Sequence, residues 1–308
     1  MDMINVGVIG VGSIGKHHAR IFSSLEGVRL VGIVDADFSR AEEFAQKYNC
    51  RAFSDYMKIM DSVDAVSIAV PTTFHFDVAI DFLKNNKSIL IEKPITSTLE
   101  EAEALIAEAE KRKLILQVGH LERFNAGVSM ISAMVEKPRF IESQRLSPFL
   151  GRGIDVDVTL DLMIHDIDII LSLVKSEISD IRATGAKVLT ENLDIAHAWI
   201  EFSNGCIAEA VTSRMANEKV RQLKGFQHNS FLNLDYQKQE LVSYTKLNGN
   251  VEKEIRRPEA KEPLREQLAS FIECVKHGTR PLVSGHEGRE ALNVALKISK
   301  LVHHGLNI

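Results

Sequence analysis

The chain has 308 residues, of which 45% are hydrophobic and 26% charged, and its formal net charge is −5. The length favours two domains, and the acidic balance argues against nucleic acid or an anionic membrane as a partner. No apolar stretch approaches the roughly 18 residues of a membrane-spanning helix. The first expected strand begins at Ile4, which leaves no room for a signal peptide, so we expect a cytoplasmic protein.

The first 35 residues predict a dinucleotide-binding unit. An apolar strand at Ile4–Ile9 runs into Gly10-Val11-Gly12-Ser13-Ile14-Gly15, and helical spacing follows over Lys16–Ser24. A second strand, Leu30–Val34, ends in Asp35. A GxGxxG motif alone is weak evidence, but here the strand, the helix and the acid are all in place. The alternative is a glycine-rich turn in some other α/β protein.

Each part of this unit has a physical role. Gly10 permits the tight turn, Gly12 lets the backbone approach a pyrophosphate, and Gly15 lets helix and strand pack closely. The N–H groups at the helix start attract phosphate, with Ser13 and Ile14 beside them. Asp35 can accept hydrogen bonds from an adenosine ribose and would repel a 2′-phosphate, so we expect NAD as the cofactor.

Strands and helices continue to alternate up to residue 118, a pattern typical of a doubly wound parallel sheet. The further elements expected are strands at Cys50–Phe53, Ala65–Val70, Ser88–Lys93 and Leu114–Val118, and helices at Phe38–Tyr48, Tyr56–Met60, Phe74–Lys84 and Leu99–Arg112.

The remainder predicts an α+β domain with a mostly antiparallel open sheet. Asn204-Gly205 is a strong hairpin signal between two of its strands. The strands expected are Arg139–Arg145, Ile181–Leu189, Ala196–Phe202, Cys206–Arg214, Arg221–Gln227, Phe231–Tyr236 and Glu240–Tyr244, and the helices are Asn125–Glu136, Val158–Val174, Leu264–His277 and Glu287–His303. The sequence therefore predicts an α/β fold with a Rossmann domain at residues 1–118 and a substrate-binding and oligomerisation domain at residues 119–308.

The three cysteines, Cys50, Cys206 and Cys274, are far apart and odd in number. They form neither a disulfide framework nor a pair with metal-ligand spacing. We expect free thiols and no metal cofactor.

Lys93 stands at the carboxyl end of an expected parallel strand, in Glu92-Lys93-Pro94. Ligands of open α/β sheets bind at that edge. An ammonium beside a cationic nicotinamide should have a lowered pKa and could exchange a proton with a substrate hydroxyl. The alternative is a surface lysine in a turn.

Asp161 and His165 are four residues apart and share one face of an expected helix. His165 could act as a general acid or base, with Asp161 orienting it. A buried histidine that pairs with Asp161 or Asp168 is an equally simple interpretation, and a metal site that includes Asp166 is a weaker one.

Arginines are the natural ligands of a substrate anion, and Arg123, Arg152 and Arg214 are the candidates. The alternative for each is a surface or interface ion pair. His17 and His18, one turn past the glycine loop, are expected to pack and cap rather than to catalyse.

The motifs named above, in this order, resemble those of the glucose–fructose oxidoreductase/inositol dehydrogenase/rhizopine catabolism (Gfo/Idh/MocA) family. The resemblance covers the whole chain and includes Val70-Pro71-Thr72-Thr73-Phe74-His75, Glu92-Lys93-Pro94 and the segment from Asp161 to His165. It implies NAD(P) binding that involves Pro71, Thr72, His75, Glu92 and Lys93. It also implies catalytic roles for Lys93, Asp161 and His165 and a homodimer or homotetramer built through the C-terminal sheet.

The segments at 116–125 and 158–169 look like a subgroup that includes UDP-N-acetylglucosamine 3-dehydrogenases, although Ala126 stands where similar sequences tend to have proline. The subgroup implies oxidation of a sugar nucleotide to a 3-keto sugar, which an aminotransferase then converts for lipid A. The alternatives are a dehydrogenase of a free polyol such as inositol and a non-catalytic dinucleotide sensor.

Overall fold

The computed structural model describes residues 3–149, 151, 156–259 and 261–306. The chain forms two compact units, here named unit 1 (Met1–Leu121 with Glu262–Arg289) and unit 2 (Glu122–Lys261 with Glu290–Ile308). In the described part of the chain, no helix combines the length and the apolar character needed to cross a membrane.

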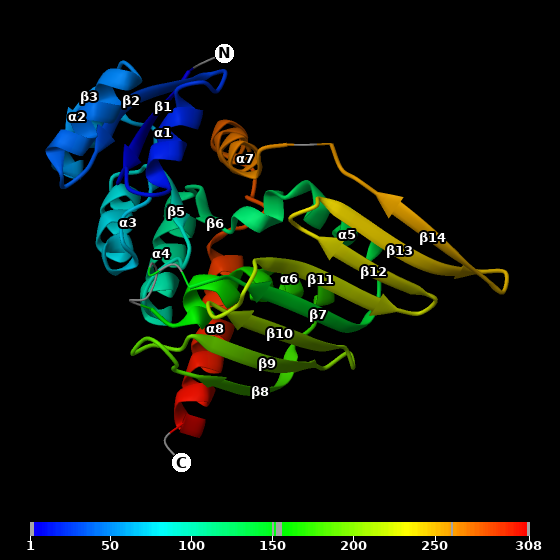
Figure 1. The fold of residues 1–308 in the computed structure, drawn as a ribbon. Coiled ribbons are helices and arrows are strands. Elements are labelled where there is room, and N and C mark those ends of the chain that lie inside the picture. The colour runs from blue at the N-terminus through cyan, green and yellow to red at the C-terminus, as the bar shows by residue number, and fades with distance from the viewer. Residues whose placement is uncertain (1–2, 150, 152–155, 260, 307–308) are drawn as a thin grey trace. The chain divides into compact units, whose positions relative to one another are not determined.

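Unit 1 contains a parallel six-stranded sheet in the order β3-β2-β1-β4-β5-β6 (Figure 1). The strands are β1 (Ile4–Ile9), β2 (Val28–Val34), β3 (Arg51–Phe53), β4 (Ala65–Ile68), β5 (Ser88–Glu92) and β6 (Leu116–Gly119). The order reverses between β1 and β4, and ligands of such sheets bind outside the carboxyl ends at that point. The expected doubly wound fold is confirmed.

Helices cover the sheet of unit 1. They are α1 (Gly15–Phe22), α2 (Phe38–Lys47), α3 (His75–Lys84), α4 (Leu99–Arg112) and α7 (Pro263–His277), with 3₁₀ turns at Tyr56–Ser62, Thr72–Phe74 and Leu121–Phe124. Thr98 and Glu101 form a capping box at the start of α4, which explains why its bounds follow the sequence pattern.

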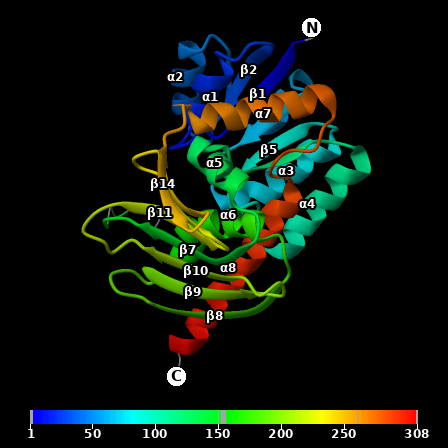
Figure 2. The same cartoon turned by 90° about the vertical axis from the view of Figure 1, so that its right-hand side faces the viewer.

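Helix α7 departs from the domain division expected from the sequence. It comes late in the chain, yet its apolar face, which includes Leu268 and Phe271, shares a core with Ala19 and Phe22 of α1. Figure 2 shows α7 beside α1. The expected boundary at residue 118 therefore does not describe the whole of unit 1. Residues 262–289, which follow most of unit 2 in the sequence, also belong to unit 1.

Unit 2 contains an eight-stranded sheet in the order β14-β13-β12-β11-β7-β10-β9-β8. The strands are β7 (Pro138–Leu146), β8 (Ile178–Ala186), β9 (Ile195–Phe202), β10 (Ile207–Ser213), β11 (Val220–Gln227), β12 (Ser230–Asp235), β13 (Glu240–Leu247) and β14 (Asn250–Arg256). All neighbouring pairs are antiparallel except β7 with β10, so the expected mostly antiparallel sheet is confirmed. The expected turn at Asn204-Gly205 joins β9 to β10, with Gly205 at a φ of +81°.

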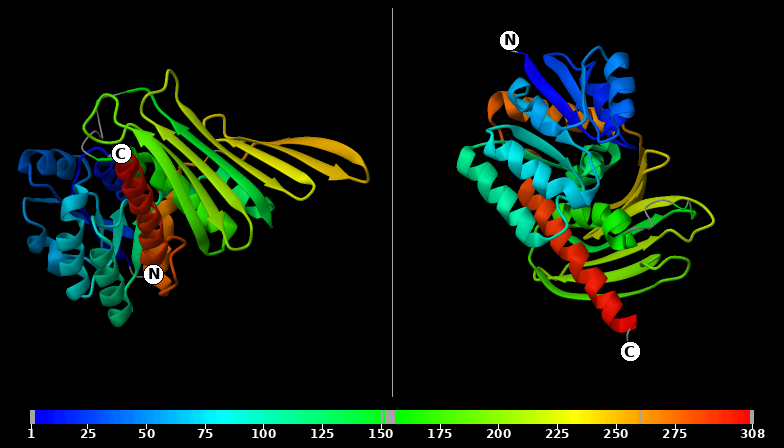
Figure 3. Two further views of the ribbon diagram at one scale, coloured as in Figure 1. Left: turned by 90° about the horizontal axis from the view of Figure 1, so that it is seen from below. Right: turned by 90° about the vertical axis from the view of Figure 1, so that its left-hand side faces the viewer.

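One face of this sheet carries the core of unit 2. Strand residues such as Ile141, Leu223 and Leu241 alternate inward and pack with Ile167 of α6 and Ile298 of α8. Figure 3 shows the helices gathered on that face of the sheet. The helices of unit 2 are α5 (Ala126–Met134), α6 (Ile164–Val174) and the C-terminal part of α8 (Gly285–Leu306).

The helix expected over Val158–Val174 is not regular. It opens with a π-helical turn, η4 (Thr159–Met163), and becomes the α-helix α6 only at Ile164. Its start is tied to the segment before β9, because the Val158 N–H donates to the Leu193 carbonyl oxygen at 3.0 Å. A π turn inside a helix is frequent at functional sites.

Candidate active-site residues

The turn between β1 and α1 has the shape that a dinucleotide pyrophosphate requires. Gly10 has a φ of +87°, and a Cβ at Gly15 would lie 1.9 Å from the Gly10 carbonyl oxygen, so both positions need glycine. A Cβ at Gly12 would meet nothing within 4 Å, which leaves this backbone open to a ligand. Ser13 is exposed, and Ile14 precedes α1 without a side-chain cap. The first N–H groups of α1 can therefore serve phosphate oxygens.

Asp35 stands at the end of β2 beside this turn. Its Oδ2 accepts from the Val11 N–H at 2.9 Å and its Oδ1 accepts from the Asp37 N–H at 2.9 Å. Arg40, which sequence reasoning missed, places Nη1 3.6 Å from Asp35 Oδ2. The carboxylate is thus held at the position where a ribose is expected, with a cation at its side.

Lys93 follows the last residue of β5 and is half-buried at the carboxyl edge of the sheet. The preceding Glu92 turns its carboxylate toward α1, where Oε1 lies 3.3 Å from Nε2 of His18. His18 is fully buried, which agrees with the packing role expected for it.

His75 joins the ends of β4 and β5. It is 1% exposed, and its Nδ1 and Nε2 lie 2.9 Å from the Pro94 carbonyl oxygen and 3.0 Å from the Val70 carbonyl oxygen. Burial lowers the pKa of His75, and the contacts with the two carbonyl oxygens oppose this shift. Pro71 is exposed and Thr72 is half-buried in the same loop.

Asp161 and His165 lie on the π turn and on α6, in unit 2. Both side chains are half-buried, whereas Asp166 and Asp168 on the same helix are each 2% exposed. The burial pattern separates the two candidate catalytic groups from two buried acids with structural partners.

A buried charge cluster lies behind this helix and was missed in the sequence. Arg145 is 1% exposed; its Nε lies 2.7 Å from Asp166 Oδ2 and its Nη1 lies 3.0 Å from Glu122 Oε1. Arg221 places Nη1 3.4 Å from the same Glu122 oxygen, and the Tyr236 ring lies 5.8 Å from the Arg145 guanidinium. Burial and Asp166 raise the pKa of Tyr236 well above its usual value. The available signal was an arginine at an inward position of the expected strand Arg139–Arg145.

The arginines expected to hold a substrate anion have protein partners. Arg123 places Nη1 3.3 Å from Asp168 Oδ1. Arg214 donates from Nη2 to the Val156 carbonyl oxygen at 2.9 Å, and its Nε lies 3.9 Å from Asp194 Oδ1. The third candidate, Arg152, lies outside the described residues.

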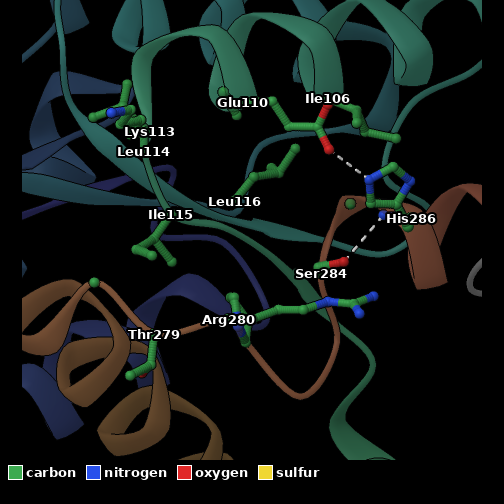
Figure 4. A pocket seen from close by; sticks show the side chains of 14 residues that line it. Ile106, Glu110, Lys113, Leu114, Ile115, Leu116, Thr279, Arg280, Ser284 and His286 are labelled. Carbon is green, nitrogen blue, oxygen red and sulfur yellow. Dashed lines mark hydrogen bonds and ion pairs between the residues drawn. The ribbon is translucent and has the colours of Figure 1, made fainter.

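No group of three or more His, Cys, Asp or Glu side chains among the described residues could hold a metal ion. A cavity of about 480 Å³ opens at the amino edge of unit 1's sheet, near the start of β6 (Figure 4). His286 Nε2 lies 2.8 Å from Glu110 Oε1 at its wall, and Arg280 and Leu116 also line it. None of the expected site residues lines this cavity, so it is separate from the edge that carries Lys93.

The glycine turn, the uncapped helix and Asp35 define a Rossmann-fold dinucleotide-binding protein. Comparison with known proteins narrows this class. A model described as "Oxidoreductase family, NAD-binding Rossmann fold" matches residues 4–120, and the GFO/IDH/MocA C-terminal domain matches residues 128–225. The chain belongs to the GFO/IDH/MocA oxidoreductase family, as its motifs predicted.

Two curated relatives and one solved structure show how far the similarity extends. UDP-N-acetylglucosamine 3-dehydrogenase of Acidithiobacillus ferrooxidans is 34% identical, with 97% of each chain covered. Its solved structure matches with a TM-score of 0.94 over 99% of both chains. scyllo-Inositol 2-dehydrogenase (NAD⁺) of Bacillus subtilis is 26% identical, with 99% of this chain and 96% of that protein covered. The predicted oxidoreductase class and NAD-binding domain are therefore confirmed.

Proposed function

We propose that the protein is an NAD-dependent dehydrogenase that oxidises C3 of UDP-N-acetylglucosamine, or of a closely related sugar nucleotide, to the ketone. The observation that carries this proposal is the 34% identity to the UDP-N-acetylglucosamine 3-dehydrogenase over nearly the full length of both chains. The inositol dehydrogenase at similar coverage is less similar, at 26%.

The residues of the proposed site divide the work. When bound, NAD⁺ would supply an acceptor for the hydride of the carbinol carbon. The glycine turn and α1 would hold its pyrophosphate, and Asp35 would select its ribose. Lys93 or His165 takes the hydroxyl proton, and Asp161 orients the substrate or the imidazole. The variants Lys93→Met and His165→Ala, described in the Discussion, test whether these two groups take part in the proton transfer.

Oxidation of a free polyol is the second candidate, and one observation favours it. Arg123 and Arg214 are engaged with Asp168 and with the Val156 carbonyl oxygen, so neither is positioned for a diphosphate in this conformation. A diphosphate bound to a chain of net charge −5 needs local cations.

A substrate screen separates the two candidates. The protein is mixed with NAD⁺ and with UDP-N-acetylglucosamine, other nucleotide sugars or free polyols, and NADH formation is followed by absorbance. In a parallel reaction, an aminotransferase specific for 3-keto sugar nucleotides is added, because it removes the unstable ketone. Amination of the ketone is the step expected on the way to lipid A. NADH formation only with inositol or another free polyol would replace the proposal by the second candidate.

We also propose that the outer face of the eight-stranded sheet joins copies of the chain into a homodimer or homotetramer. A ladder of aromatic rings crosses this face, with centroid distances of 5.8 Å from Trp199 to Phe140, 5.8 Å from Phe140 to Phe226, 4.8 Å from Phe226 to Phe231 and 6.0 Å from Phe231 to Tyr244. All five side chains are partly exposed, whereas the core lies on the other face. Aromatic surfaces of this kind are typical of interfaces.

A further inference from the structure

Two buried polar side chains and the half-buried Glu92 connect the dinucleotide helix to β5, which ends one residue before Lys93. His18 of α1 and Ser67 of β4 are both 0% exposed, and His18 Nδ1 lies 2.6 Å from Ser67 Oγ. On the other side of the ring, Nε2 lies 3.3 Å from Glu92 Oε1. That second contact has the distance of an ion pair but not the alignment of a hydrogen bond.

A glycine on the neighbouring strand makes room for the Glu92 carboxylate. Gly119 of β6 pairs in register with Glu92 of β5. A Cβ at Gly119 would lie 2.6 Å from Glu92 Oε1, so any larger residue would push the carboxylate aside. The carboxylate is therefore held between α1 on one side and β6 on the other.

We propose that His18 is a positioning residue that couples dinucleotide binding at α1 to the placement of Lys93. The uncapped N-terminal end of α1, where a pyrophosphate would bind, lies one turn before His18, and Glu92 is bonded directly to Lys93. A polar contact inside a low-dielectric core resists displacement more than a surface contact does. This inference rests on the proposed function, because it takes Lys93 as a group that acts on the substrate.

Two substitutions at His18 separate the two ring contacts. Asparagine places a donor near the Nδ1 position only, whereas glutamine reaches the Nε2 position and can still meet Glu92. We expect His18→Asn to lower kcat about 5- to 150-fold, the usual range of a coupling between two sites, while Kd for NAD⁺ changes less than about threefold. His18→Gln should retain most of kcat. The exposed His17 is the matched control, and His17→Asn should leave both constants unchanged. Equal loss in His18→Asn and His18→Gln would overturn the proposal.

Gly119→Ala tests the same contact from the opposite side. Its new methyl group displaces only the flexible end of Glu92, so the melting temperature should change little while kcat falls as in His18→Asn. Because both changes break one contact, the double variant should lose no more than either single variant. Additive losses would overturn the proposal. Gly225→Ala, where the nearest atom to a new Cβ is 3.5 Å away, is the control for the glycine substitution itself.

Hydrogen exchange supplies a readout that needs no turnover. NAD⁺ should slow amide exchange in residues 91–96 of the unaltered protein, and this protection should be lost in His18→Asn even though NAD⁺ still binds. Equal protection in both proteins, or none in either, would overturn the coupling. If the protection behaves as expected but no sugar or polyol is oxidised, the proposed function fails and the coupling stands.

Discussion

Arg145 on β7 holds Asp166 on α6 by two parallel hydrogen bonds, from Nε to Oδ2 at 2.7 Å and from Nη2 to Oδ1 at 3.1 Å. Burial opposes the charge of Arg145, but Asp166 and Glu122 outweigh burial and raise the pKa of the guanidinium. Asp166 directly follows His165, so this pair fixes the helical turn that presents the imidazole. The pair is therefore a structural support for a candidate catalytic group in unit 2.

We predict that Arg145→Met destabilises unit 2 by about 3–5 kcal/mol, because it removes the guanidinium that pairs with the buried Asp166 and leaves Glu122 with Arg221 as its cation. The free energy of unfolding is measured in denaturant from the fluorescence of Trp199, the only tryptophan, which lies on β9. Arg139→Met, at an exposed position of the same strand, is the control. Equal effects of the two substitutions would contradict a special role for the buried pair. Adding Asp166→Leu to Arg145→Met should restore part of the loss.

We predict that Lys93→Met lowers turnover about 10²–10⁴-fold and leaves NAD⁺ binding nearly intact, as expected for a lost acid–base group. His165→Ala should also lower turnover. Steady-state rates and equilibrium NAD⁺ binding measure the two effects separately. Cys50→Ala is the control: burial raises the pKa of this thiol to about 11, so it stays protonated and should contribute nothing. Retention of more than about half of normal turnover by Lys93→Met would remove Lys93 from the proposed proton transfer.

The sequence predicted unit 1 well because local signals and the fold agree there. The glycine turn admits few other conformations, the capping box fixes the start of α4, and the buried strands read as apolar runs. The placement of Lys93 at a strand end followed from the same pattern. The sequence could not show that His18 reaches Ser67 and Glu92, because those contacts join residues 49 and 74 positions away.

Unit 2 was predicted less completely, for physical reasons that differ by element. The edge strand β14 is exposed on both faces, so it lacks the alternation that marks a half-buried strand. The return of α7 to unit 1 depends on tertiary packing, which periodicity does not encode. Arg123 and Arg214 have the positive charge that an anion-binding site requires. The sequence could not show that they pair with Asp168 and Asp194, because these residues become neighbours only in the folded chain.

We predict that Asp35→Ser narrows the preference for NAD over NADP by about tenfold, or 1.4 kcal/mol. The carboxylate repels a 2′-phosphate, and its removal leaves Arg40 as a cation at that position. Titration with the reduced cofactors, followed by the fluorescence of their dihydronicotinamide ring, gives both dissociation constants. When Arg40→Ala is added to Asp35→Ser, the binding of NADP should become weaker. Tighter binding of NADP than NAD by the unaltered protein would show that Asp35 does not select the cofactor.

We predict that Phe226→Glu converts the proposed oligomer into monomers. Phe226 lies in the middle of the aromatic ladder, between Phe140 and Phe231, and a charge buried there without a partner would cost several kcal/mol. Light scattering after size exclusion gives the mass, which is 34.4 kDa for one chain. Met57→Glu, at an exposed apolar position of unit 1, should leave the mass unchanged. A monomeric unaltered protein would refute the proposed interface.

The Asp194 carboxylate closes the loop that precedes β9. Its Oδ2 accepts the N–H groups of Val188, Leu189 and Thr190 at 2.8, 2.7 and 3.0 Å, and its Oδ1 accepts the Thr190 hydroxyl at 2.7 Å. Burial alone would raise the pKa of Asp194, but these hydrogen bonds outweigh it and lower the pKa to about 2. The charged form is therefore the one that the folded chain stabilises.

The pH dependence of stability follows from the sign of that shift. Because the folded pKa lies below the unfolded value of 3.8, the stabilisation is complete above about pH 5 and is lost as the pH falls through about 2. We predict that Asp194→Asn lowers the free energy of unfolding by about 2 kcal/mol at pH 7 and that the difference shrinks to a small fraction of this value at about pH 2, where about half of the native carboxyls are neutral. Denaturant unfolding followed by Trp199 fluorescence at several pH values, at one protein concentration, measures this difference. Asp180→Asn, at an exposed position, should show no such trend. A difference that stays constant from pH 7 to pH 2 would mean that the loop depends on the shape of Asp194 and not on its charge.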